Sequence, residues 1–262
     1  MNKKILWIIA IVVLVAIFAL LGWNFYKSKT EKVKNPIVTM EVEGYGTVKI
    51  ELYPDKAPET VANFVKLVND GHYTEKTFYR TIPEFMVQAG SRTENLDYTI
   101  KGEFVANGYA KNNLKFERGV IGMARADYSS LGLTEEGYNS GSADFFIMHA
   151  DYPSLNGYYT AFGKVTEGIE VIDAIANAEV HYRDTELGED EEVPVDENGE
   201  EYASDNPVTE PVITSMTVET FGVDYGEPEK LTPFDYNKWL YEQYGIDLSS
   251  TSIDLDDTTA EE

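Results

Sequence analysis

The stretch FYRTIPEFMVQAG, residues 78–90, is the most informative part of the sequence. If it forms strands, whose side chains alternate between two faces, Arg80 and Gln88 can share one surface. Phe85 or Met86 would lie on that same surface, and an arginine beside apolar side chains indicates a task for its guanidinium. The alternative is that Arg80 pairs with a surface carboxylate while Phe85 packs in the core.

The surrounding sequence predicts a mainly β domain with two helices. Residues 37–52 alternate apolar and polar side chains around a glycine-rich turn, which indicates a β-hairpin. Residues 57–71 contain a helix that opens on a proline and stops at a glycine. Short apolar runs across residues 77–163 indicate further strands, residues 167–178 a second helix, and residues 212–220 a closing strand. Two helices and about eight strands predict a closed barrel capped at its ends.

The N-terminal region predicts a membrane anchor. Residues 5–23 contain no charge, and a helix of that length spans roughly 28 Å, close to the ~30 Å hydrocarbon core of a bilayer. Trp7 and Trp23 lie near its two ends, where interfacial aromatic residues are expected. A cleaved signal peptide is the alternative, but the run exceeds the usual apolar core of such peptides and lacks an Ala-x-Ala site.

We therefore expect a single-pass protein of the cell membrane. Its N-terminal segments are a short tail (1–4), the transmembrane anchor (5–24) and a basic tether (25–35). Lysines flank the anchor on both sides, so the positive-inside rule does not decide its orientation. An acidic domain without cysteine suits an extracytoplasmic location, which is the orientation we expect.

The negative charge is concentrated in the C-terminal third. The 262 residues include 21 Lys+Arg and 46 Asp+Glu, a net charge of −25. Residues 1–180 carry 18 Lys+Arg and 22 Asp+Glu, a net of −4, whereas residues 181–262 carry 3 and 24, a net of −21. We therefore predict a folded domain at 36–222 interrupted by an acidic insertion at 181–207, and an acidic tail at 223–262.

Two local signals lie within these acidic segments. Asn198-Gly199 predicts an exposed hairpin inside the insertion. In the tail, Thr232-Pro233 predicts the start of a short helix over residues 233–244. Residues 249–262 are polar and predicted to be disordered.

The composition and motifs exclude several chemistries. The absence of cysteine rules out a disulfide scaffold, a thiolate zinc site and a cysteine nucleophile. His72, His149 and His181 form no HExxH pattern, and no GxSxG elbow, phosphate-binding loop or dinucleotide fingerprint is present. The acidic charge disfavours a nucleic-acid partner. We therefore expect neither a metal nor a cofactor.

The run at residues 78–90 closely resembles the signature of cyclophilin-type peptidyl-prolyl cis-trans isomerases, here in a membrane-anchored, bacterial-like form. The resemblance continues in four further stretches. They are LYPDKAPETVANFVKLVNDGHY (52–73), GVIGMARA (119–126), SGSADFFIMHAD (140–151) and LNGYYTAFGKVTEGIEVIDAI (155–175). The family resemblance covers about residues 36–180 and resumes at residues 207–222.

This resemblance implies an eight-stranded antiparallel barrel with a helix at each end and a substrate site on its outer face. The implied activity is interconversion of X–Pro bonds in proline-containing polypeptides. The implied catalytic residues are Arg80, as hydrogen-bond donor, together with Phe85 and Gln88. The implied substrate-binding residues are Met86, Ala124, Arg125, Asp144, Phe146, Leu155 and Tyr159.

The chain departs from the family pattern at several of these positions. Arg125 replaces the usual Asn, and Asp144 replaces the usual Gln. Asp144 could pair with Arg125 or Arg80 and so restrain the catalytic guanidinium. Tyr159 aligns with the usual His, and Ser154 with a position often held by Trp. Because that Trp contributes to cyclosporin binding in the family, we expect weak cyclosporin binding.

Three functions remain open from the sequence. The first is an active isomerase that assists folding of exported proteins, which Arg80 and the apolar site residues favour. The second is a binding module or holdase with weak or no turnover, which Arg125 and Asp144 favour. The third, an adhesion or cell-wall attachment protein, rests only on the anchor and the acidic tail.

Overall fold

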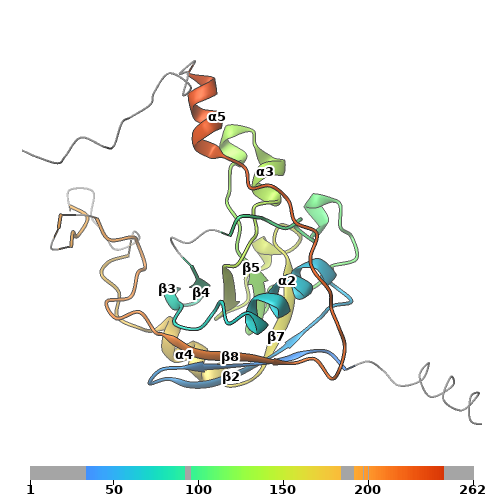
Figure 1. Cartoon of the computed structure of the whole chain (residues 1–262). Helices are drawn as coiled ribbons and strands as arrows, with labels where there is room; N and C mark the ends of the chain where they lie inside the picture. Colours follow the sequence, from blue (N-terminus) through green and yellow to red (C-terminus); the bar gives the residue numbers. More distant parts are fainter. Residues whose placement is uncertain (1–33, 92–95, 184–191, 197, 200, 245–262) are drawn as a thin grey trace, which may run out of the picture. The chain divides into compact units, whose positions relative to one another are not determined.

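The computed structural model (Figure 1) describes residues 34–91, 96–183, 192–196, 198–199 and 201–244. By their contacts the residues fall into two units, Met1–Asn35 and Pro36–Glu262, and all the described helices and strands belong to the second. The predicted anchor, most of the tether and the end of the tail lie outside the described residues. Within the described part, no helix has the length and apolarity needed to cross a bilayer.

The second unit is mainly β, as predicted. Its strands are β1 (Ile37–Val42), β2 (Gly46–Leu52), β3 (Thr77–Ile82), β4 (Met86–Gly90), β5 (Val120–Met123), β6 (Phe145–Met148), β7 (Ala161–Glu167) and β8 (Ile213–Glu219). Its α-helices are α2 (Pro58–Asn69), α3 (Thr134–Tyr138), α4 (Ile169–Ala176) and α5 (Tyr236–Gln243). Three 3-10 turns are at Val105–Asn107, Ser129–Leu131 and Pro153–Leu155.

The eight strands form one antiparallel half-barrel, in the order β3-β4-β6-β5-β7-β2-β1-β8. Backbone hydrogen bonds also link the two edge strands. The Ile213 N–H donates to Lys76 O (2.8 Å), and the Phe78 N–H donates to Pro211 O (2.9 Å). These bonds leave few unpaired backbone groups where β3 approaches β8.

Strand register separates the two faces of the sheet. Val87 of β4 is opposite Ile147 of β6, which is opposite Ile121 of β5. All three are fully buried in the main core, where the apolar faces of helices α2 and α4 also pack. Because side chains alternate along a strand, the residues adjacent to Val87, Ile147 and Ile121 project from the opposite face of the sheet.

Helix α2 is fixed at its N-terminus by a carboxylate from a distant loop. The Glu59 and Thr60 N–H groups donate to the carboxylate of Glu103 (3.1 and 2.8 Å), and the Thr60 hydroxyl also donates to it (2.7 Å). Burial raises the pKa of Glu103, while these hydrogen bonds act in the opposite direction. The negative charge lies at the positive end of the helix dipole, so it holds α2 in place.

The predicted hairpin in the insertion is present. Val195 pairs with Glu201, and the Tyr202 N–H donates to Pro194 O (3.0 Å). Gly199 in its turn has a φ of 81°, which a residue without Cβ adopts at no steric cost.

The predicted helix in the tail is also present, but its start at Thr232-Pro233 is wrong. Helix α5 begins at Tyr236, and its N-cap is Asp235, whose carboxylate accepts the Lys238 N–H (2.8 Å). The residues before it are extended because both backbone groups of Leu231 bond to Thr99. This long-range pairing has no local sequence signal.

Candidate active site

Four residues lie in one row across the outer face of the sheet. Arg80 of β3 is opposite Gln88 of β4, and Gln88 is opposite Phe146 of β6. Phe146 is in turn opposite Gly122 of β5. Directly opposed residues in antiparallel strands project to the same face, so Arg80, Gln88 and Phe146 share one surface. The predicted common surface for Arg80 and Gln88 is thus confirmed.

An apolar cluster, distinct from the main core, lies beside this row. Its buried members are Met86, Phe116, Val120, Phe146, Met148 and Ala161. Its partly buried members are Ile82, Phe85, Leu114, Ala124, Leu155 and Tyr159. The structure therefore brings together six of the predicted site residues, namely Phe85, Met86, Ala124, Phe146, Leu155 and Tyr159. Such a surface can hold the apolar ring of a proline.

Phe116 and Gly122 shape this cluster, and the sequence did not identify either of them as a site residue. The Phe116 ring stacks on Phe146 with centroids 5.5 Å apart, while Tyr159 meets Phe146 edge-on at 5.8 Å. A Cβ on Gly122 would lie 2.4 Å from Phe146 and 2.7 Å from Phe116. Only glycine therefore leaves room for both rings. Phe116 precedes β5 in a loop, so no strand periodicity predicts the direction in which its side chain points.

The Arg80 guanidinium is available to a ligand. Its side chain is half-buried, and within the described residues it has no hydrogen-bond or ion-pair partner. A guanidinium remains charged at physiological pH and presents a fixed fork of N–H donors. It can therefore donate to a carbonyl or amide group placed over the adjoining apolar cluster.

Asp144 is engaged by neutral donors and not by either arginine. The Tyr79 hydroxyl donates to Asp144 Oδ2 (2.7 Å), and the Ser91 N–H donates to Oδ1 (2.7 Å). The Gln88 amide donates to the Tyr79 hydroxyl. Burial, followed by the negative charge of Asp144, raises the pKa of Tyr79 well above its usual value. The phenol therefore stays protonated, and the expected pairing of Asp144 with Arg80 or Arg125 is wrong.

Arg125 lies over aromatic rings instead. Its guanidinium carbon is 4.3 Å from the centroid of Tyr159 and 5.0 Å from that of Tyr138. Its Nε donates to Tyr158 O (3.1 Å), and its Nη1 donates to Ala126 O (2.8 Å). A cation against an aromatic face is stabilised by the ring quadrupole. Arg125 therefore fixes Tyr159 at the border of the apolar cluster.

The base of the acidic insertion covers the rest of the outer edge of β3, the strand that carries Arg80. The Thr81 N–H donates to Asp205 O (2.9 Å), and Arg183 Nη1 donates to Thr81 O (2.9 Å). The Arg183–Asp205 ion pair (3.0 Å) joins these two contacts. Asn206 Nδ2 also donates to Tyr79 O (3.0 Å). These bonds satisfy edge-strand backbone groups that would otherwise face solvent.

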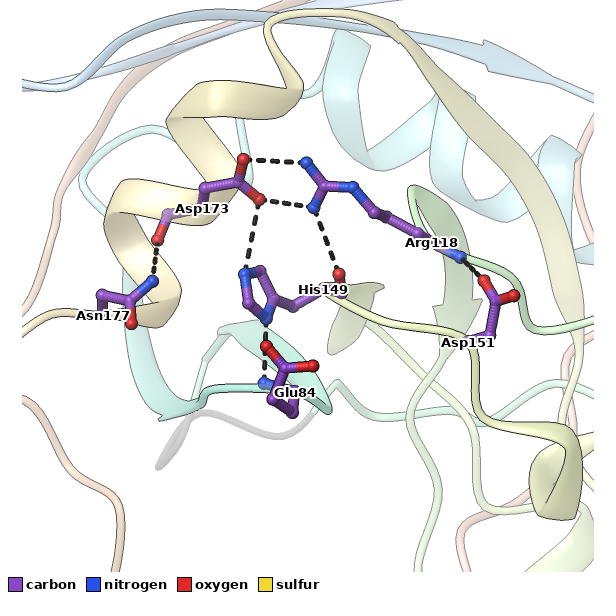
Figure 2. Close-up of polar contacts among 6 residues, drawn as sticks. All are labelled: Glu84, Arg118, His149, Asp151, Asp173 and Asn177. Carbon is purple, nitrogen blue, oxygen red and sulfur yellow. Dashed lines mark hydrogen bonds and ion pairs between the residues drawn. The ribbon is translucent and has the colours of Figure 1, made fainter.

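A polar cluster that includes Glu84, Arg118, His149 and Asp173 (Figure 2) holds the turn before Phe85. The Glu84 N–H donates to His149 Nδ1 (2.9 Å), and the His149 N–H donates to Phe85 O (2.9 Å). His149 Nε2 lies 3.4 Å from Asp173, whose carboxylate also accepts both terminal nitrogens of Arg118. The hydrogen bond from Arg118 lowers the pKa of Asp173. Helix α4 and β6 thus jointly fix a turn between β3 and β4.

This turn contains a strained residue. Glu84 has a φ of 59°, in the left-handed region that residues with a Cβ seldom adopt. The Phe85 ring, which follows it, packs against Tyr152 with centroids 4.4 Å apart. The His149 contacts therefore hold Phe85 in place by stabilising an unfavourable backbone conformation.

No metal site accompanies this arrangement in the described part of the chain, where no three His, Asp or Glu side chains gather as ligands. The site itself offers one unpaired cation, an amide and an apolar surface. Comparison with known proteins agrees with that chemistry. Residues 37–217 match the sequence profile of the family described as "Cyclophilin type peptidyl-prolyl cis-trans isomerase/CLD".

The chain belongs to the cyclophilin family. It is 40% identical over 143 residues to peptidyl-prolyl cis-trans isomerase B of Bacillus subtilis, covering 53% of this chain and 90% of that protein. It is 32% identical over 161 residues to a peptidyl-prolyl cis-trans isomerase of Helicobacter pylori, covering 59% of this chain and 90% of that protein. Family and relatives together identify this cyclophilin as a peptidyl-prolyl cis-trans isomerase.

The fold agrees with that of a solved cyclophilin. The crystal structure of a Cryptosporidium parvum cyclophilin type peptidyl-prolyl cis-trans isomerase, obtained in the presence of the dipeptide Ala-Pro, superimposes with a TM-score of 0.52. The match has 25% sequence identity and covers 70% of this chain and 98% of that chain. The expected family and the mainly β antiparallel fold are confirmed.

Substitution of His149 tests whether the turn that bears Phe85 must be held. In His149→Leu the Glu84 N–H loses its acceptor, and one such bond contributes about 1 kcal/mol. We expect kcat/KM to fall about fivefold, measured by NMR exchange on a proline-containing peptide. Asp173→Asn is the matched comparison. It weakens the contacts of Asp173 with Arg118 and His149 Nε2 but keeps the Glu84–His149 bond, so its loss should be smaller. An equal loss in both variants would contradict this assignment.

Proposed function

We propose that this cyclophilin accelerates X–Pro rotation on the outer face of its sheet, with Arg80 as the hydrogen-bond donor to the rotating amide. The observation that carries the proposal is an unpaired guanidinium in the same row as Gln88 and Phe146, beside a separate apolar cluster. Phe85, Met86, Phe146 and Leu155 hold the proline ring. Gln88 and the backbone of Ala124 and Arg125 bind the adjoining chain.

The reaction needs little more than this arrangement. Rotation about a peptide C–N bond meets a barrier of about 18–20 kcal/mol because resonance gives it partial double-bond character. X–Pro isomers differ by only about 0.5–1 kcal/mol, so both are populated and only their exchange is slow. A site lowers the barrier when it binds the twisted amide more tightly than the planar one. A donor to the amide nitrogen supplies that difference, because it holds the nitrogen lone pair that develops as the amide twists and so weakens resonance.

The alternative of a binding module with weak turnover loses its main support. It rested on Asp144 restraining the catalytic guanidinium, whereas Asp144 accepts from Tyr79 and Ser91. Arg125 points its guanidinium at Tyr159 and at backbone carbonyls. Neither Asp144 nor Arg125, two residues that depart from the family pattern, contacts the Arg80 guanidinium.

We also propose that residues 5–24 anchor the protein in the cell membrane with the domain outside, where it acts on exported polypeptides. The support is the uncharged 19-residue run at 5–23, flanked by interfacial tryptophans, together with the acidic, cysteine-free chain that follows. Cyclosporin binding is proposed to be weak because Ser154 stands where many cyclophilins have Trp.

Arg80→Ala tests the donor. We expect the catalysed exchange rate, measured by NMR on a short X–Pro peptide, to fall about 100-fold, the scale of losing a preorganised donor. Arg80→Lys should recover part of it at most, because a lysine lacks the fork of N–H groups. Lys49→Ala, which removes a cation of β2 that pairs with Glu167 (2.8 Å), should leave the rate unchanged. If the exchange rate is the same with wild type, with Arg80→Ala and without protein, the proposed isomerase activity is refuted.

Ser154→Trp tests the basis of weak cyclosporin binding. An added indole contributes about 1.5–3 kcal/mol of apolar burial, so we expect the dissociation constant to tighten at least tenfold. Isothermal titration of both proteins gives the comparison. Wild-type affinity equal to that of a Trp-bearing cyclophilin would show that position 154 does not control binding.

Protease treatment of intact cells tests the location. With a C-terminal epitope tag, proteinase K should remove the tag from intact cells without lysing them, because the tail lies outside. A cytoplasmic protein probed in the same sample serves as the control for cell integrity. A tag protected until the cells are lysed would place the domain inside.

A further inference from the structure

A bulge in β3 places Tyr79 and Arg80 on the same face of the sheet. The register between β3 and β4 shifts between Phe78 and Arg80, so β3 has one extra residue at this point. The burial pattern agrees, because Phe78 and Thr81 are buried whereas the two residues between them are half-buried. In a regular strand, consecutive side chains would project to opposite faces. The bulge therefore brings the Tyr79 phenol to the outer face, beside Gln88.

A chain of hydrogen bonds connects this phenol to two other elements. The Tyr79 hydroxyl donates to Asp144 Oδ2 (2.7 Å), and Gln88 Nε2 donates to the Tyr79 hydroxyl. The other carboxylate oxygen, Asp144 Oδ1, accepts the Ser91 N–H (2.7 Å). A Cβ on Gly90 would overlap the Asp144 side chain, so glycine is needed for this close approach. The carboxylate is thus held in one place at the end of β4.

The direction of the chain follows from its single shared proton. An ionised carboxylate only accepts hydrogen bonds, so the phenol must donate its one proton to Asp144. Burial, followed by the negative charge of Asp144, raises the pKa of Tyr79, so the proton stays on the phenol. The phenol oxygen can then only accept from Gln88, which must turn its NH2 group toward it. The Gln88 Oε1 atom lies on the other branch of the amide and consequently faces away from Tyr79.

This oriented oxygen is available to a substrate. Gln88 is half-buried, and no residue in the described part of the chain donates to its Oε1. Gln88 is opposite Arg80 on one side and Phe146 on the other, so the amide borders the surface proposed to hold the proline. Every residue of a substrate except proline has a backbone N–H. A fixed amide oxygen can accept one of these N–H groups.

We propose that Tyr79 and Asp144 are positioning residues, which fix the Gln88 amide so that its oxygen accepts a backbone N–H of the substrate within two residues of the proline. Asp144, which the family resemblance assigned to substrate binding, acts here through the phenol. The inference rests on the proposed function at Arg80 and deepens it by defining the substrate class. The site selects X–Pro segments in which the residue at that position is not itself a proline.

Ester substitution of the substrate tests the accepted N–H. In a series of X–Pro peptides, each backbone N–H within two residues of the proline is replaced in turn by an ester oxygen. The ratio of kcat/KM for the amide peptide to kcat/KM for the ester peptide is measured by NMR exchange. At one position we expect wild type to favour the amide about fivefold, the effect of one hydrogen bond. Gln88→Met, which removes the amide at similar size, should lower this ratio to about one.

Asp144→Asn tests the direction of the chain. The introduced amide keeps an oxygen for the Ser91 N–H but presents a donor to the Tyr79 oxygen. Tyr79 can then donate to Gln88, which turns its oxygen toward the phenol and its NH2 group toward the substrate. We expect the amide-to-ester ratio to fall to about one. The substitution hardly changes the side-chain volume, so a packing defect does not account for such a change.

Tyr79→Phe tests whether Asp144 acts through the phenol. Without the hydroxyl the Gln88 amide takes either orientation, so the ratio should fall to about twofold or less. Adding Asp144→Asn to Tyr79→Phe should change the ratio no further. Tyr45→Phe, which removes an exposed phenol in the turn between β1 and β2, should leave the ratio at its wild-type value. A merely structural role would lower kcat/KM for amide and ester peptides alike.

Two kinds of result would overturn the inference. The positioning role is refuted if wild type treats amide and ester peptides alike at every position, or if Asp144→Asn and Tyr79→Phe keep the wild-type ratio. In either case the function at Arg80 stands as long as Arg80→Ala loses activity on all the peptides. If wild type accelerates none of the peptides, the function fails and the inference falls with it.

Discussion

The pairing of β4 between β3 and β6 is the constraint on which the site depends. Val87 projects into the main core and Gln88 projects outward, and the same alternation separates Ile147 from Phe146. A slip of β4 by one residue would exchange its two faces, placing the Gln88 amide in the core and Val87 at the surface. The burial of Val87 and Ile147 therefore enforces the row of Arg80, Gln88 and Phe146. Core packing and active-site geometry are fixed by one register.

The electrostatics of the site follow from how neighbouring charges are engaged. Asp144 accepts from a phenol and a backbone N–H, and Asp205 pairs with Arg183. Both of these carboxylates thus have partners other than Arg80, and in the described part of the chain that guanidinium has none. Burial of the Tyr79 phenol keeps it protonated and donating to Asp144. An unpaired cation over an apolar surface is costly unless a ligand uses it, which is the state expected of a binding group.

Local patterns in the sequence predicted the elements of the domain, and the family resemblance predicted the chief site residues. Alternation marked the β1–β2 hairpin, and the proline-to-glycine span marked α2. What escaped prediction depends on contacts between distant residues. Phe116 reaches Phe146 from a loop, Asp144 meets Tyr79 from 65 positions away, and Arg183 contacts Thr81 across 102 positions. No local periodicity reports such partners, and the start of α5 was displaced by the same kind of contact between Leu231 and Thr99.

The acidic insertion has a base and a tip with different freedom to change. Its base, Arg183 with Asp205 and Asn206, supports the strand that carries Arg80, so loss of these side chains would disturb catalysis. Its tip, the hairpin with its turn at Gly199, pairs mainly with itself. Evolution can therefore alter the length and charge of the tip while the base preserves the enzyme. A catalytic domain with such an appendage can acquire new surface properties without losing its active site.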